Sequence, residues 1–531
     1  MKKIISLIFI VGSLYLASCN VTDLEPKNAV SSTTIPADSS NIELAVAGVY
    51  RSAQSQLYGY NGGNGTPNGG DNRGYAFGAA HIEQGEMRGE DLVNTQGFFT
   101  IVYQNTQTSS SPNCVNFWSA LFEVVNQANS VIDALGTTKA VKPATAAAYL
   151  GELRFLRAMA YHDLLIFFAR PYGDNPTTNL GVPYRTTPSQ RDPVGATAMT
   201  RNTVDDCYNK IIADLDFAEA NLPDTRDNQV TRATKGAAIA LKTRVYQHMN
   251  NWAKVIAEAS KLASPSLTPV SPIGGYKLNA DPFDAFKNPT TAESILSSEY
   301  SSVDQGSVNG GLGGAFQPTE FNGRGLIGVS PNLYNKSFWL ANDLRREAAN
   351  SATGGYIVNG SLGANKFIYY INKYQDAVTN TDWAPLIRYS EVLLNYSEAL
   401  ARTGDLPNSL LLLNAVRNRA VGAGNAYTTF ATQNAQIQAV LDERRIELIG
   451  EGRRWPDIHR LSTDPVFVTG GGGVPAKLLY SQVTASSYVV GSNATIAGSV
   501  KALPYSDYRF VWPVSNTEIA NNPNVAQNPG Y

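Results

Sequence analysis

Residues Val245–Ala253 read VYQHMNNWA, and residues Ala399–Pro407 read ALARTGDLP. Each stretch has the pattern of a helix end, a tight polar turn, an apolar residue and the start of a second amphipathic helix. A helical hairpin of this kind cannot bury its apolar face alone, so neighbouring hairpins must stack on one another. The two stretches therefore predict an all-α, α-rich body of stacked helical hairpins.

Apolar residues keep helical spacing in further segments along the chain. One such helix begins after Ser40-Asn41. The others are predicted at Asn116–Leu135, Tyr149–Phe168, Val204–Leu222, Ala233–His248, Leu386–Arg402, Asn408–Arg419 and Gln436–Ile449. Gly-rich or Pro-rich stretches at 59–80, 264–330 and 462–531 interrupt them and are predicted as loops. The sequence thus predicts a degenerate tetratricopeptide-repeat helical scaffold with long loop insertions.

The N-terminus has the features of an export signal. The basic start Met1–Lys3 is followed by the apolar stretch Ile4–Leu16, which is too short to span about 30 Å of hydrocarbon. The residues that follow, up to Cys19, resemble a bacterial lipobox. We therefore predict a lipoprotein signal peptide at 1–18, acyl chains such as palmitate on Cys19, a flexible tether at 19–41 and a single helical domain at 42–531. An ordinary secretory signal with an incidental cysteine is the alternative.

Composition excludes one class of partner. The 531 residues carry 42 Lys and Arg against 44 Asp and Glu, a formal charge of −2. Non-specific nucleic-acid binding requires an excess of basic side chains that bind phosphates in a salt-dependent way. This chain has no such excess, so no nucleic-acid partner is expected. Cys114 and Cys207 lie in no ligand-like spacing and are expected to be small buried residues, with one disulfide as the alternative.

Opposite charges are concentrated near the end of the last predicted helix. Arg444, Glu447, Glu451, Arg453 and Arg454 fall within a few turns of one another, which suits a networked junction between helices. A catalytic pair of Glu447 and Glu451 is geometrically possible. However, the flanking arginines would keep both carboxylates ionised, which disqualifies either one as a general acid.

Other motifs give little support for catalysis or a cofactor. The stretch Gly323–Gly328 satisfies G-x-G-x-x-G, but its flanking prolines predict a loop instead of a dinucleotide site. No G-x-S-x-G elbow is present. Glu90 and Asp91 could still coordinate Ca²⁺ from a loop. The four histidines have no metal-ligand spacing; they are His81, His162, His248 and His459. We therefore expect neither a metal nor another cofactor.

Aromatic residues in loops are the candidates for ligand contact. Sugar rings present apolar C–H faces that stack on aromatic planes, while amides, carboxylates and guanidinium groups bind the hydroxyls. The stretch 88–105 offers this mixture. Its predicted ligand-binding residues are Arg88, Asp91, Phe98, Phe99, Tyr103 and Asn105. For each of them, packing or contact with a protein partner is the alternative.

Several blocks along the chain resemble the signature of the SusD/RagB family of outer-membrane nutrient-uptake lipoproteins. ERRIEL at 443–448, running into EGRRW at 451–455, is the most specific of them. Family-like blocks elsewhere are ELRFLRAMAY at 152–161, PYGDNP at 171–176, ATKGA at 233–237, RYSEVLLNYSEA at 388–399 and the ending from WPV at 512–514 to NPGY at 528–531. Departures at Ile449-Gly450 and Pro456 concern local packing only.

The resemblance implies a lipid-anchored, surface-exposed protein of the cell outer membrane. Such a protein captures a nutrient, most often an oligosaccharide, and delivers it to a SusC-like TonB-dependent transporter without acting as an enzyme. In relatives the glycan site resembles a shallow patch formed by the 88–105 region and a later insertion, which here carries Phe316, Phe321, Asn322 and Arg324. The alternatives are a peptide ligand, or a protein that only caps the transporter and whose loop aromatics bury one another.

Overall fold

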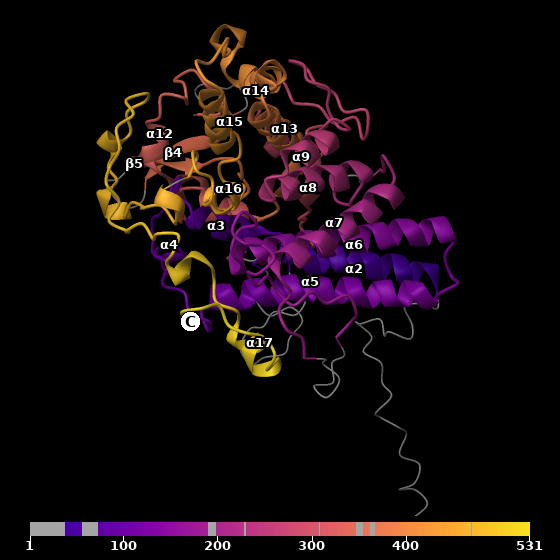
Figure 1. Cartoon of the computed structure of the whole chain (residues 1–531). Helices are drawn as coiled ribbons and strands as arrows, with labels where there is room; N and C mark the ends of the chain where they lie inside the picture. Colours follow the sequence, from indigo (N-terminus) through magenta and orange to yellow (C-terminus); the bar gives the residue numbers. More distant parts are fainter. Residues whose placement is uncertain are drawn as a thin grey trace, which may run out of the picture.

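The computed structural model describes residues 38–55, 73–189, 198–227, 230–306, 308–346, 354–361, 367–468 and 470–531 (Figure 1). The predicted signal peptide, Cys19 and nearly all of the predicted tether lie outside these residues. Among the helices that the structure describes, none is both long and apolar enough to cross a bilayer.

Helices packed side by side, most of them long, form the body, which confirms the predicted α-rich class. The array begins with α2, α5 and α6, continues through α7, α8 and α9, and ends with α13, α14 and α15 (Figure 1). Their bounds are α2 Ser39–Ser55, α5 Pro112–Thr137, α6 Pro143–Phe168, α7 Val204–Asn221, α8 Lys235–His248, α9 Trp252–Ala259, α13 Tyr389–Thr403, α14 Leu406–Val421 and α15 Gln433–Glu447. Each of these helices coincides within a few residues with a predicted segment or hairpin half.

The two hairpins that predicted the scaffold have matching turns. Asn250 after α8 and Gly404 after α13 both adopt a positive φ, 55° and 92°. The next residue caps the second helix in each case, since the side chain of Asn251 accepts from Lys254 N and that of Asp405 accepts from Asn408 N. Helix α13 packs against α9, so the two hairpins stack as predicted.

Short elements fill the long insertions. The short helices are α3 Ala79–Met87, α4 Thr100–Tyr103, α10 Asp284–Lys287, α11 Leu312–Phe316, α12 Pro331–Tyr334, α16 Arg454–Leu461 and α17 Asn516–Asn521. The 3₁₀ turns are η3 Thr319–Phe321, η5 Ala423–Asn425, η6 Gly470–Gly472, η7 Tyr480–Gln482, η8 Ala485–Ser487 and η9 Tyr508–Phe510. The tail from 462 onward is thus mostly loop, as predicted, and several of its residues, Trp512 among them, pack into the core.

Two small antiparallel sheets were not predicted. One has the order β1-β3-β5-β4, from Leu92–Asn94, Ile327–Val329, Phe367–Ile371 and Ile357–Ser361, and the other pairs β2, Ser294–Ser298, with β6, Ala384–Arg388. The predicted helix Leu386–Arg402 is wrong at its start, because Leu386–Arg388 belong to β6. Strands of three to five residues with both faces buried show no alternating pattern.

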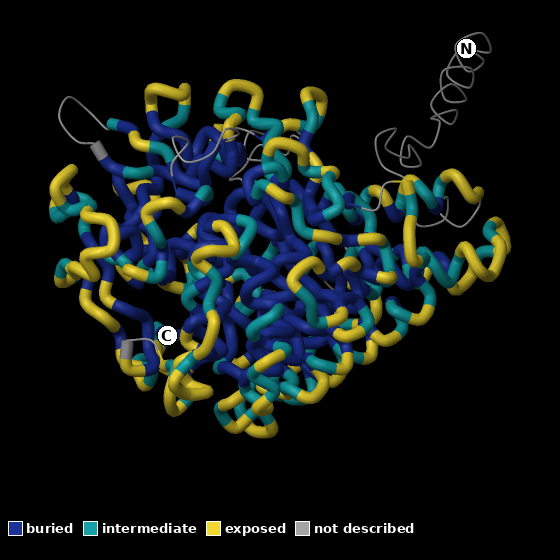
Figure 2. Tube along the Cα trace, turned by 90° about the horizontal axis from the view of Figure 1, so that it is seen from above, coloured by how far each residue is buried: buried dark blue, intermediate teal, exposed yellow. Residues whose placement is uncertain are grey.

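One hydrophobic cluster runs from Ile42 in α2 to Val525 near the C-terminus, and the buried chain occupies the interior in Figure 2. The C-terminal segment is part of this core, because Trp512 packs edge-on against Phe117 and Phe168. Cys114 and Cys207 are buried and free, as expected of small core residues. Burial raises the pKa of the Cys207 thiol to about 11, which keeps it protonated.

A buried ion network joins the end of α15 and the turn after it to the β2–β6 sheet and to α14. Arg388 at the end of β6 lies 2.6 Å from Glu293, 3.0 Å from Glu447 and 2.7 Å from Glu451. Arg419 of α14 lies 2.6 Å from Glu447 and also pairs with Glu293. Every one of these side chains is nearly or fully buried. Of the predicted charged junction, Glu447 and Glu451 join this network, whereas Arg444 pairs with Asp457 and Arg454 with Glu90.

Both candidate catalytic carboxylates are ionised in this network. Burial by itself would raise the pKa of Glu447, but the guanidinium groups of Arg419, Arg388 and Arg345 outweigh it and hold that pKa well below its usual range. The pKa of Glu451 is lowered against burial by Arg388 and Lys373. Neither carboxyl can act as a general acid near neutral pH.

All four histidines are buried, and three of them, His162, His248 and His459, lie close to one another. The ring of His248 lies 4.8 Å from that of His162 and 6.5 Å from that of His459, centroid to centroid, and His81 Nε2 lies 3.3 Å from Asp163. Burial lowers the pKa of His162 to about 3 and that of His459 to about 4. In the described part of the chain no cluster of His, Cys, Asp or Glu is suited to hold a metal ion.

Replacing Arg388 by Met will destabilise the fold strongly. The change leaves three buried carboxylates with fewer cations beside them. It is therefore expected to lower the free energy of unfolding by about 3–5 kcal/mol. Lys210→Met is the matched control, because Lys210 and its partner Asp206 are about half exposed and such a pair contributes about 0.5 kcal/mol. Urea denaturation measures both free energies of unfolding. A loss below about 1 kcal/mol in Arg388→Met would contradict the structural role of the network.

Replacing His162 by Phe will flatten the pH dependence of stability. In the unfolded chain the imidazole binds a proton near pH 6.5, but in the folded protein it does so only near pH 3, so acidification favours unfolding. Lowering the pH from 7 to 5 therefore reduces the free energy of unfolding by about 2 kcal/mol through His162. The variant lacks this contribution. The groups around His162 are Asp163, Arg244, Arg453, His248, His459 and Tyr208. Urea denaturation at the two pH values measures the effect. An equal change in the free energy of unfolding for the variant and the unmodified protein would refute it.

Candidate functional site

The structure divides the ten predicted ligand-binding residues into two groups. Six side chains are buried and packed in the interior, and four lie at or near the surface. The buried ones are Arg88, Asp91, Phe99, Tyr103, Asn105 and Phe316. The others are Phe98, Phe321, Asn322 and Arg324.

Arg88 and Asp91 hold parts of the chain together around α3 and α16. The Arg88 guanidinium lies 4.0 Å from the ring centroid of Trp455 and donates to the Phe510 carbonyl at 2.7 Å. Burial lowers its pKa to about 10, so it stays charged. Asp91 accepts from Arg445 and lies 3.2 Å from Arg454 Nε in an ion pair, and Glu90 accepts from Arg454. Arginines therefore pair with both carboxylates that were considered for Ca²⁺, and Ca²⁺ binding at Glu90 and Asp91 stays an untested expectation.

The buried aromatic candidates pack inside the protein as well. Tyr103 is 1% exposed and donates its hydroxyl to the Leu478 carbonyl at 2.7 Å. Phe99 lies under Phe98 in an edge-to-face contact of 4.9 Å, and the Phe316 ring lies 5.5 Å from that of Tyr374. Asn105 is fully buried with a φ of 56°. The three aromatic side chains pack in the interior, and burial leaves all four residues no surface for a ligand.

The pairing of β1 with β3 brings the two predicted ligand regions together. Leu92 pairs with Val329 and Asn94 with Ile327, so the chain after β1 and the chain before β3 emerge side by side. Thr95 N donates to the Leu326 carbonyl at 3.1 Å, which extends the contact beyond the strands. As a result Phe98 and Arg324, more than 200 residues apart in sequence, become neighbours.

Phe98 lies exposed between basic side chains. Its ring is 40% exposed, and the guanidinium carbons of Arg324 and Arg73 lie 4.9 and 5.0 Å from the ring centroid. Arg324 is held by Asn309 Oδ1 at 2.7 Å, and Arg73 by Glu83 at 2.7 Å. We call Arg73, Gln96, Phe98, Val308, Asn309 and Arg324 the Phe98 surface. It combines one exposed flat ring with two oriented planar donors.

Phe321 and Asn322 lie on the same insertion as Arg324. Phe321 is 47% exposed at the end of η3, and Asn322 adopts a φ of 63° that ends this turn. Glu320 accepts from Ser361 N at 2.8 Å, which ties the turn to β4. The exposed ring therefore stands on a turn that is fixed to the sheet.

Sequence reasoning missed Arg73, Gln96, Val308 and Asn309. Gln96 donates to the Arg324 carbonyl, and Val308 is 64% exposed while its carbonyl accepts from Arg324 at 3.2 Å. No local motif marks these residues, although Arg73 stands next to Tyr75 in the Gly-rich stretch. For Phe98, Phe321, Asn322 and Arg324, ligand contact stays a prediction.

Two family models match the chain over separate stretches. Residues 292–531 match the model described as "SusD family", and residues 75–247 match the one described as "Starch-binding associating with outer membrane". Among curated proteins, SusD-like protein P2 of Formosa agariphila is 25% identical over 87% of this chain and 91% of its own. A SusD-like protein of Bacteroides ovatus is 26% identical over 66% of both chains.

Solved structures share the fold. A SusD superfamily protein from Bacteroides fragilis superposes with a TM-score of 0.70 at 24% identity, over 92% of this chain and 99% of that one. Surface glycan-binding protein A from Bacteroides uniformis superposes with a TM-score of 0.67 at 19% identity, over the same shares of the two chains. At these identities the superpositions show a shared fold and nothing about function.

Proposed function

Since this chain belongs to the SusD family, we propose that it is a lipid-anchored protein of the outer-membrane surface that binds an oligosaccharide. In this proposal it hands the glycan to a SusC-like TonB-dependent transporter and catalyses no reaction. One matching family model is described as "Starch-binding associating with outer membrane", which supports both the ligand class and the location. Tethering both proteins in one membrane raises their effective concentration, which favours a stable complex.

The observation that carries this proposal is the Phe98 surface. An exposed aromatic ring offers a platform for the C–H face of a sugar. The guanidinium groups of Arg324 and Arg73 lie over the ring. Arg324 presents N–H donors to hydroxyl groups, whereas each guanidinium nitrogen of Arg73 already donates within the protein. Such a surface has no closed end, so it suits the middle of a chain lying across it.

The exposed aromatics also bear on the rival role of a transporter cap without its own ligand. That role requires the loop aromatics to bury one another. Phe99, Tyr103 and Phe316 are buried, but Phe98 and Phe321 are 40% and 47% exposed. Exposed rings on anchored turns favour capture of a ligand.

Replacing Phe98 and Phe321 together by Ala will abolish glycan retention. Affinity gels containing starch and other polysaccharides are run with lipid-free protein, residues 20–531. Loss of two stacking rings is expected to weaken binding about tenfold or more, equal to about 1.4 kcal/mol. Tyr508→Ala is the matched control, because Tyr508 is 43% exposed and also lies near an arginine, Arg509 at 5.7 Å.

Retention by the unmodified protein and by Tyr508→Ala, but not by the double variant, supports the proposal. Retention that persists in the double variant would remove the ligand from the Phe98 surface. No retention on any polysaccharide by folded protein would favour a peptide ligand or a capping role.

Replacing Cys19 by Ala will release the protein from the membrane. The thiol is the proposed site of acylation, and several acyl chains anchor a protein stably where one does not. Metabolic labelling with a palmitate analogue and fractionation of cells measure the effect. Label and outer-membrane location that survive in Cys19→Ala would contradict the anchor.

A further inference from the structure

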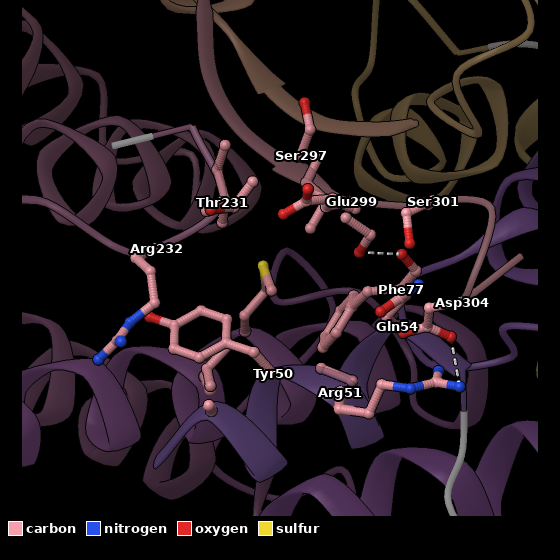
Figure 3. A pocket seen from close by; sticks show the side chains of 17 residues that line it. Tyr50, Arg51, Gln54, Phe77, Thr231, Arg232, Ser297, Glu299, Ser301 and Asp304 are labelled. Atoms are coloured by element: carbon pink, nitrogen blue, oxygen red, sulfur yellow. Dashed lines mark hydrogen bonds and ion pairs between the residues drawn. The ribbon is translucent and has the colours of Figure 1, made fainter. Parts of the chain in front are cut away.

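A pocket of about 390 Å³ opens between helix α2 and the chain around β2. Its walls come from α2, α6, residues 231–232 and residues 296–304 (Figure 3). None of the ten predicted ligand-binding residues lines it, and it shares no residue with the Phe98 surface. It is therefore a separate hollow on a protein whose predicted site is a flat surface.

The floor of the pocket is apolar and rigid. Phe77, Leu156, Met159 and Leu296 line it, and each is 1–2% exposed because it is also part of the hydrophobic core. The Ser298 hydroxyl donates to the Phe77 carbonyl at 2.6 Å, which fixes the chain beside the ring. Such a floor cannot collapse into the hollow without disturbing the core.

The rim is polar, and most of its charges already have partners. Arg51 Nη2 lies 2.5 Å from Asp304 at one end of the pocket, and Arg232 lies at the other end (Figure 3). The Nε of Arg232 lies 2.6 Å from Glu152. Tyr50 donates its hydroxyl to the same Glu152 at 2.8 Å. Glu299 is exposed on the same rim and belongs to none of the ion pairs among the described residues, so the rim disfavours an anion. We therefore take a neutral molecule with several hydroxyl groups as the best fit, since its hydroxyls can donate to this carboxylate.

We propose that this pocket is a second binding site that takes the terminal one or two neutral sugar rings of a glycan. The C–H face of the ring lies on the apolar floor, and its hydroxyls bond to the Arg51–Asp304 pair and to Ser297 and Ser301 on the rim. The volume is at the lower end of the roughly 300–1,000 Å³ of small-ligand pockets. A closed floor admits a chain end, whereas the Phe98 surface accepts a chain from the side.

This inference rests on the proposed function only for the class of ligand. The two sites are joined by one short stretch of chain, because Ser301 and Asp304 line the pocket while Asn309 holds Arg324 of the Phe98 surface. Binding at the pocket is independent of Phe98 and Phe321, which permits separate tests.

Saturation-transfer NMR with maltose, cellobiose, xylobiose and their monosaccharides tests the pocket. Ala47→Trp places a large ring at the rim from an exposed position of α2. Leu44→Trp is the matched control, because Leu44 is 62% exposed on the same helix and lines no part of the pocket. At least one sugar is expected to bind the unmodified protein and Leu44→Trp, and to bind Ala47→Trp about tenfold more weakly.

Asp304→Asn provides a second variant in case Ala47→Trp folds poorly. It removes one charge of a partly exposed rim pair without filling the hollow, and it is expected to weaken the same sugar several-fold. A sugar that binds all variants equally, or the absence of binding by any tested sugar, overturns the proposal.

The outcomes separate the two sites. If Phe98→Ala with Phe321→Ala loses polysaccharide but keeps the small sugar, both proposals stand. If the polysaccharide is retained and no small sugar binds, the pocket proposal fails alone. If a small sugar binds in the pocket but no polysaccharide is retained, the proposal for the Phe98 surface fails alone.

Discussion

The placement of Arg388 among Glu293, Glu447 and Glu451 is the constraint on which the rest of the structure depends. Transferring these charges out of water costs far more than a surface ion pair returns, so they are tolerated only when every partner is in place. Three separate parts of the chain must therefore meet at one point: the start of β2, the end of β6 and the turn after α15. This requirement couples the helical array to the inserted segments.

The same turn positions the candidate ligand surface. Gly452, one residue after Glu451, donates its N–H to Glu86 at 2.8 Å and so fixes α3. Burial raises the pKa of Glu86 to about 8. From α3 the chain passes Asp91, which Arg445 and Arg454 clamp, and continues through β1 to Phe98. The exposed Phe98 ring is thus connected to the buried ion network through α3, Asp91 and β1.

The Phe98 surface and the pocket beside α2 use different physical means. The first offers a partly exposed ring with two guanidinium groups over it, and in the proposal it accepts a chain of any length. The second offers a rigid apolar floor and a rim of paired charges, and its volume limits the ligand to a few rings. Together they would let one protein hold a polymer both along its length and at its end.

The sequence by itself determined the long helices, the stacked hairpins and the charged junction. Amphipathic spacing over four or more turns has few structural solutions, and the turns at Asn250 and Gly404 are marked by residues that tolerate positive φ. Tertiary structure alone decided the two sheets, because strands of three to five residues carry no periodic signal of their own. It also decided which candidates face solvent: Phe98 and Phe99 are adjacent, yet one is 40% exposed and the other 2%. Exposure of a loop side chain depends on what packs against it from distant parts of the chain, and for Phe98 those neighbours are Arg73 and Arg324, which no local pattern connects.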